Sequence, residues 1–174
     1  MHILFEKLGI KKGDKIALAG RNCANWAVAY LAITAYEGVV VSILQDFTAE
    51  NIAYLLEHSD SDMLFVGPYV WKELKEPTLP KRIKVVFSLE DFSTISSKEG
   101  IVVPTPEEID SEFQKRHPDG LQADDVNFNA DLEALSIINY TSGSTGSPKG
   151  VMLNGRSISN NIIEVAFKVL PVEP

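Results

Sequence analysis

The sequence has a single cysteine, Cys23, among its 174 residues. One thiol excludes a disulfide within the chain, and the histidines stand singly at positions 2, 58 and 117, without metal-site spacing. No apolar run approaches the roughly 18 residues of a membrane-spanning helix. The first residues also lack the basic segment and apolar core of a signal peptide. We therefore expect a cytoplasmic chain without a membrane span.

Positive charge is also scarce. The chain has 16 Lys and Arg against 24 Asp and Glu, which gives a net charge of -8. This balance argues against a nucleic-acid partner, because phosphate backbones bind basic surfaces, and it means that an anionic ligand must be held locally. With 45% hydrophobic and 23% charged residues, the composition is that of a globular protein. Residues 1–174 are predicted to form a single domain.

Short apolar runs alternate with helical stretches, which is typical of a parallel sheet built from strand-helix-strand units. The predicted strands cover residues 15–20, 39–44, 62–67, 83–89, 132–139 and 149–154. Predicted helices follow at 26–38, from Thr48 onward, at 69–74, 106–115 and 157–170. The polar, acidic residues 93–130 are interpreted as a surface excursion. The expected fold class is α/β, a layered fold with a mainly parallel sheet flanked by helices.

The turn before the first long helix contains Cys23 and two asparagines. Asn25 is the predicted N-cap, since asparagine side chains accept hydrogen bonds from the first turn of a helix. A cysteine at such a turn could act as a nucleophile, but the sequence places no histidine partner beside it. Cys23 is therefore predicted to be a buried structural residue.

The stretch YTSGSTGSPKG, residues 140–150, holds the strongest functional signal. Glycines allow consecutive peptide N–H groups to converge on one anion, and hydroxyl side chains add further donors. Lys149 adds a mobile positive charge. A strand precedes the stretch, and ligands of open parallel sheets bind beyond the carboxyl ends of strands. The combination predicts a loop that binds a polyphosphate.

Two other interpretations compete with this one. A Gly/Ser/Thr-rich stretch can be a flexible linker, although linkers seldom join two buried strands of one domain. The P-loop of nucleotide triphosphatases has the pattern G-x-x-x-x-G-K-[ST]. Counted from Gly143, its second glycine falls on Pro148, and Lys149 is followed by Gly150. A P-loop would also continue into a helix, whereas 151–153 is predicted to be strand.

The same eleven residues, with Val151, resemble the AMP-binding signature of the adenylate-forming enzymes, which include acyl-CoA synthetases, luciferases and peptide-synthetase adenylation domains. Every fixed glycine, the proline and the lysine are in place. Residues 9–43, GIKKGDKIALAGRNCANWAVAYLAITAYEGVVVSI, also resemble the early part of that family. The run KGVML and the acidic stretch before the signature look most like long-chain fatty acid CoA ligases.

This resemblance implies an enzyme that activates a fatty acid with ATP and Mg²⁺ to an acyl-adenylate and then transfers the acyl group to coenzyme A. By the family's pattern, Lys149 is the catalytic residue and reaches the terminal phosphate. The phosphate-binding residues would be Thr141, Ser142, Gly143, Ser144, Thr145, Gly146 and Lys149. The implied partners are therefore small molecules, and peripheral contact of the full-length protein with a membrane is left open.

The sequence departs from the family's pattern at several points, including the joint at Val41-Ser42, where the family usually carries proline. Asn154-Gly155-Arg156 stands where the family usually has Thr-His-Arg. The family is also much longer, so the chain is expected to be a truncated N-terminal part of the AMP-binding domain, without the C-terminal catalytic portion. Such a fragment is predicted to be inactive alone and to bind polyphosphate only with about millimolar affinity.

Three classes of function stay open at this point. The first is an adenylate-forming ligase, with a short-chain acid or an amino acid as the alternative substrate. The second is a P-loop-like nucleotide hydrolase or kinase. The third is a binding or scaffold domain that has kept the loop as a structural turn.

Overall fold

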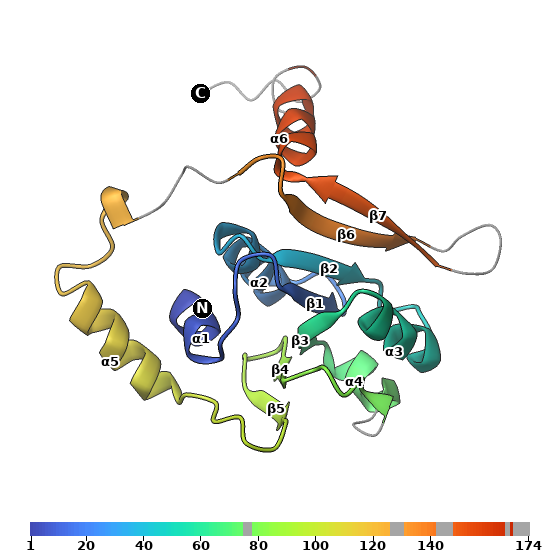
Figure 1. Ribbon diagram of the computed structural model, residues 1–174, viewed down its shortest axis with the longest axis horizontal. Helices are drawn as coiled ribbons and strands as arrows, with labels where there is room; N and C mark the ends of the chain where they lie inside the picture. The colour runs from blue at the N-terminus through green and yellow to red at the C-terminus, as the bar shows by residue number, and fades with distance from the viewer. Residues whose placement is uncertain (75–77, 126–130, 142–147, 166–167, 169–174) are drawn as a thin grey trace.

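The computed structural model describes residues 1–74, 78–125, 131–141, 148–165 and 168. Its strands form one seven-stranded sheet in the order β5-β4-β3-β1-β2-β6-β7 (Figure 1). The strands are β1 (Lys15–Ala19), β2 (Val39–Ile43), β3 (Ser61–Val66), β4 (Val85–Ser88), β5 (Thr94–Ser97), β6 (Leu135–Thr141) and β7 (Lys149–Asn154). The α-helices are α1 (His2–Lys7), α2 (Ala24–Ala35), α3 (Ala49–His58), α4 (Pro68–Leu74), α5 (Pro106–Arg116) and α6 (Gly155–Glu164).

The five inner strands, β4-β3-β1-β2-β6, pair in parallel, and the two outer strands pair antiparallel with their neighbours. The predicted α/β fold with a mainly parallel sheet is therefore confirmed. Parallel neighbours need a crossover, and helices α2, α3 and α4 lie in the connections between the first four strands. The carboxyl ends of the inner strands consequently lie along one edge of the sheet.

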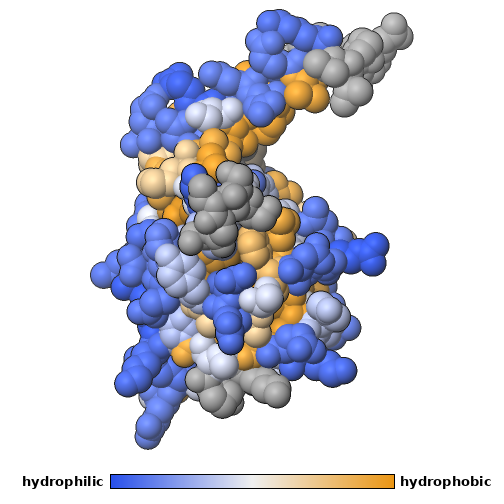
Figure 2. Space-filling view, turned by 90° about the vertical axis from the view of Figure 1, so that its right-hand side faces the viewer, coloured by the Kyte–Doolittle hydropathy of each residue, from blue (hydrophilic) through white to orange (hydrophobic). Residues whose placement is uncertain are grey.

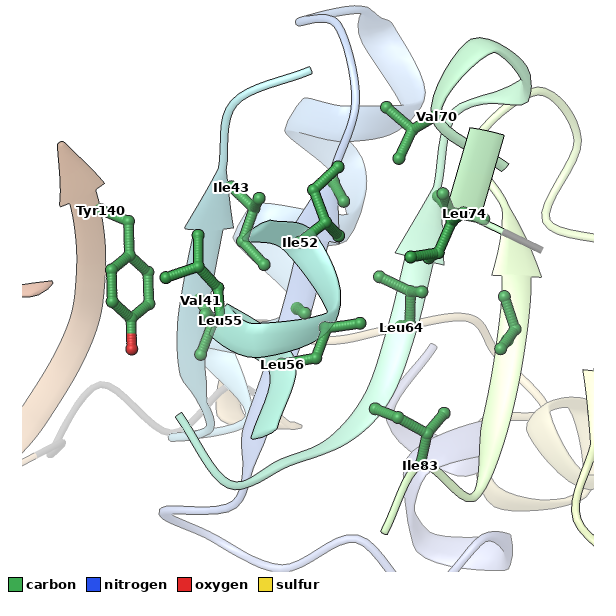
Figure 3. Packing of buried hydrophobic residues seen from close by; sticks show 14 of the residues in the cluster. Val41, Ile43, Ile52, Leu55, Leu56, Leu64, Val70, Leu74, Ile83 and Tyr140 are labelled. Atoms are coloured by element: carbon green, nitrogen blue, oxygen red, sulfur yellow. The ribbon is translucent and has the colours of Figure 1, made fainter. Parts of the chain in front are cut away.

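Helices cover both faces of this sheet. On one face α3 and α4 pack through residues such as Leu55, Leu56 and Leu74 against the strands (Figure 3). On the other face α1 and α2 contribute Phe5, Ala29 and Ile33 to a second buried cluster. Because successive strand residues point to opposite faces and both faces are covered, the inner strands read as continuous apolar runs.

The start of α2 differs from the prediction. Cys23, not Asn25, is the N-cap, and its Sγ accepts a hydrogen bond from the Trp26 N–H at 3.4 Å. The Asn25 side chain instead donates to the backbone oxygens of Leu89 and Glu90 at 3.0 and 2.7 Å, which ties this turn to the end of β4. The prediction of a buried Cys23 is also wrong, since its capping position leaves it exposed.

Residues 93–125 run along the outside of the molecule, as expected for an excursion, but they contain the unpredicted strand β5. Helix α5 begins with a capping box, in which Thr105 and Glu108 bond each other's backbone N–H groups. Arg116 at its end forms an ion pair with Glu6 of α1 at 2.7 Å. In the part of the chain that the structure describes, no helix combines the length and apolar character needed to cross a membrane.

Candidate functional site

Strands β6 and β7 form a hairpin that brackets the predicted phosphate loop. Tyr140 pairs with Gly150, and Thr141 pairs with Lys149, so these two pairs form the stem from which the loop leaves the sheet. The side chains of both Thr141 and Lys149 are exposed. The other predicted binding residues lie outside the described residues, namely Ser142, Gly143, Ser144, Thr145 and Gly146.

The position of this stem follows from the residues of β6. Ile137, Ile138 and Tyr140 are buried, and β6 pairs in parallel with β2 through residues 137–139. The strand therefore ends at Thr141, at the same edge of the sheet as the carboxyl ends of β1, β2, β3 and β4. Ligands of open α/β sheets bind outside this edge. The loop is thus attached where the fold offers a ligand site.

Two hollows open at the same edge. One, of about 440 Å³, is lined by residues that include Arg21, Cys23 and Asn25, and the other, of about 520 Å³, by residues that include Arg21, Gln45 and Asp46. Gly20 and Gly67 line both sides of this junction between β1 and β3. A Cβ on Gly20 would lie 3.1 Å from the Gly67 nitrogen, so the two strand ends can approach only because glycine stands there.

These hollows were not predicted from the sequence. Their signal was a glycine at the last position of two predicted strands, Gly20 in 15–20 and Gly67 in 62–67. That the two strands are neighbours, and so bring the glycines together, depends on the strand order, which the sequence does not state.

A larger hollow lies elsewhere in the described part of the chain. It has a volume of about 680 Å³ and lies between α2 and α6, with Lys15, Leu31, Leu135 and Ile162 among its lining residues. Lys15 and Leu135 begin their strands, so this hollow is at the amino ends, opposite to the loop. Figure 2 shows hydrophobic residues where the hairpin and α6 join the rest of the molecule. The volume of a hollow therefore does not identify where a phosphate group would bind.

Tyr140 links the loop stem to helix α3. It is 2% exposed, and its hydroxyl lies 2.7 Å from Nδ1 of His58, the last residue of α3. Burial raises the pKa of the Tyr140 hydroxyl, and the neighbouring Tyr54 and Asp60 raise it further. Tyr140 therefore remains protonated at neutral pH and is suited to a hydrogen bond rather than to proton abstraction.

The stretch Asn154-Gly155-Arg156, in which Arg156 matches the family's pattern, has structural roles at the other end of β7. Asn154 is the N-cap of α6, with its Oδ1 accepting from the Ser157 N–H at 2.9 Å. Arg156 forms an ion pair with Glu133 near the start of β6. Both residues lie a whole strand away from Lys149, so neither contributes to the loop stem.

The hairpin decides between the interpretations of the loop. A P-loop requires a helix directly after its lysine, whereas Lys149 begins strand β7. A flexible linker separates structural units, whereas Tyr140 and Gly150 are paired in one sheet. Within the described residues, no group of three or more His, Cys, Asp or Glu side chains could hold a metal ion. The described residues therefore favour neither a P-loop nor a linker.

Comparison with known families agrees with this geometry. The family described as "AMP-binding enzyme" matches residues 2–173, nearly the entire chain. The chain belongs to the AMP-binding enzyme family. Its curated relatives in this family include "Fatty acyl-CoA synthetase A" of Dictyostelium discoideum, which is 31% identical over 170 residues. That alignment covers 97% of this chain and 25% of the relative.

Another curated relative shows a similar identity and coverage. "Long chain acyl-CoA synthetase 1" of Arabidopsis thaliana is 28% identical over 159 residues, covering 89% of this chain and 23% of the relative. The chain thus spans about a quarter of the length of such relatives. The solved structure of a long-chain-fatty-acid-CoA ligase from Archaeoglobus fulgidus has the same fold. Its TM-score is 0.66 at 20% identity, over 95% of this chain and 29% of that one.

Proposed function

We propose that this chain supplies the phosphate-binding loop of an ATP-dependent ligase that activates a fatty acid as an acyl-adenylate and transfers it to coenzyme A. The observation that carries the proposal is the β6–β7 stem, which holds Thr141 and Lys149 opposite each other at the ligand edge of the sheet. Membership of the AMP-binding family supports the general reaction. The names of the curated relatives support a fatty acid as the acid substrate.

The loop residues would supply both neutral hydrogen-bond donors and one positive charge. Hydroxyls of Thr141, Ser142, Ser144 and Thr145, with the amides of Gly143 and Gly146, would hold the β- and γ-phosphates. Lys149 would contact the terminal phosphate. When the acid attacks the α-phosphate, negative charge accumulates on the departing pyrophosphate, and donors already in place stabilise it without reorganisation. Magnesium would enter with ATP and would neutralise part of the charge of the phosphates.

The products of ATP separate this proposal from a kinase or hydrolase. In the presence of MgATP, a fatty acid and coenzyme A, we expect the whole protein to release AMP and pyrophosphate in equal amounts. Chromatography of the nucleotides measures this directly. Release of ADP and inorganic phosphate would contradict the proposal, because it would place bond cleavage at the γ-phosphate. An acid-dependent exchange of pyrophosphate into ATP would identify the adenylate as the intermediate.

The choice of acid is tested in the same assay. Long-chain fatty acids, short-chain acids and amino acids are compared by their kcat/KM values for AMP release. We expect the long-chain acids to have the highest values. A preference for an amino acid would retain the adenylate chemistry and overturn the assignment of the substrate.

A further inference from the structure

One hydrogen bond ties the phosphate-loop stem to a helix that is distant in the sequence. The Tyr140 hydroxyl and Nδ1 of His58 lie 2.7 Å apart, across 82 positions of the chain. The two rings meet edge to face, with centroids 5.9 Å apart. His58 is also near Tyr54, one turn earlier in α3, with ring centroids 5.6 Å apart. His58 therefore sits between a partner on its own helix and a partner on the hairpin.

The ring of Tyr140 is also held by the strand opposite. A Cβ placed on Gly150 would lie 3.1 Å from Cε1 of Tyr140 and 3.1 Å from Cγ2 of Ile138. The tyrosine ring thus lies directly over the backbone of Gly150, its cross-strand partner. Contact with Gly150 fixes the ring on the hairpin, and the bond to His58 fixes its tip on α3.

Helix α3 provides a rigid support for this bond. Ile52, Leu55 and Leu56 are at most 2% exposed and belong to the same buried cluster as Tyr140 (Figure 3). Thr48 caps the amino end of the helix by accepting from the Asn51 N–H. His58, at the opposite end, is itself exposed. It joins a well-packed helix to the first residue pair of the loop stem.

We propose that His58 is a positioning residue for the phosphates of ATP, which it influences by holding Tyr140 and, through it, the stem pair formed by Thr141 and Lys149. The inference rests on the proposed function of the loop. Its physical basis is that donors stabilise developing charge only when they are held in place before reaction. Tyr140 is adjacent to Thr141 in the chain and lies over the neighbour of Lys149, so its position affects both sides of the stem.

A positioning role predicts a specific pattern of kinetic changes in the whole protein. Tyr140→Phe keeps the ring and removes only the hydroxyl, whereas His58→Leu removes the other partner. Each change should raise the KM for ATP about five-fold, the value of one hydrogen bond, and leave the KM for the acid unchanged. The double variant should be no worse than either single variant, because both remove the same bond. His58→Asn, whose amide can occupy the position of Nδ1, should restore most of the affinity.

The matched control is Tyr36→Phe. The Tyr36 hydroxyl donates to the Ile10 oxygen at 2.9 Å, at a site remote from the loop. Its loss should lower the thermal stability as much as Tyr140→Phe does, without changing the KM for ATP. A general structural role of His58 would instead give additive losses, or equal changes in the KM values of both substrates. Either result would overturn the inference.

Failure of this inference can be separated from failure of the proposed function by including Lys149→Ala. If Lys149→Ala slows pyrophosphate exchange about 100-fold while Tyr140→Phe leaves the KM for ATP unchanged, only the role of His58 is wrong. If Lys149→Ala has no effect on exchange, the phosphate-binding function itself is wrong. Because Tyr140→Phe retains the buried ring, the test does not depend on whether His58→Leu folds.

Discussion

Replacing Lys149 by alanine in the whole protein is expected to slow ATP–pyrophosphate exchange about 100-fold. Lys149 is exposed at the first position of β7, opposite Thr141, and carries the positive charge closest in sequence to the loop. If it contacts the terminal phosphate, its loss removes an interaction that strengthens as the pyrophosphate departs, and single donors of this kind contribute about 100- to 1,000-fold to rates. The measurement is the initial rate of radiolabelled pyrophosphate incorporation into ATP at saturating acid.

Two further variants control this experiment. Lys115→Ala removes another exposed lysine, from α5 on the outside of the molecule, and should leave the rate unchanged. Lys149→Arg keeps the charge but changes its shape, and should retain part of the activity. An exchange rate in Lys149→Ala within about two-fold of the unmodified protein would contradict the assigned role, since one lost phosphate contact costs more than that.

Phe65→Ala is expected to cause the largest loss of stability, about 3 to 5 kcal/mol. Phe65 is fully buried in β3, stacks on Phe87 of β4 with ring centroids 5.3 Å apart, and meets Phe92 edge to face. The truncation leaves a cavity beneath the central strands as well as losing the apolar contacts. Urea denaturation, followed by the fluorescence of Trp26 and Trp71, gives the change in the free energy of unfolding.

An exposed aromatic residue provides the comparison for Phe65. Tyr69, in the first turn of α4, is 68% exposed, and Tyr69→Ala should change the free energy of unfolding by less than about 0.5 kcal/mol. A loss below about 1 kcal/mol for Phe65→Ala would be inconsistent with a close-packed cluster on that face of the sheet.

The inner strands could be predicted from the sequence because a strand that is buried on both faces consists mainly of apolar residues. Runs such as VVVSI of β2 contain β-branched residues at consecutive positions, which favours a strand covered by helices on both sides. Strand β5 lacks this continuous apolar pattern. Its residues, TISS, are half-buried or exposed at the sheet edge, and tertiary pairing with β4 rather than composition makes them a strand. Helix α1 was missed because its six residues are too few to show a helical period.

Membership of the AMP-binding family could also be predicted, since the family's signature resides in one continuous stretch of sequence. The supporting contacts could not. His58 and Tyr140 are far apart in the chain, and nothing in the residues around His58 indicates a partner on β6. Cys23 was wrongly expected to be buried because its residue type is usually buried, whereas its position before α2 makes it an exposed cap. The sequence thus predicts features that lie in one continuous stretch, but it does not predict contacts between residues that are far apart in the chain.

The most direct test of the account is calorimetric titration of the whole protein and its Lys149→Ala variant with magnesium pyrophosphate and, separately, with AMP. If the loop holds the terminal phosphates, the variant should bind pyrophosphate at least about tenfold more weakly and AMP within about twofold of the unmodified protein. Unchanged pyrophosphate affinity, or an equal loss for both ligands, would contradict it.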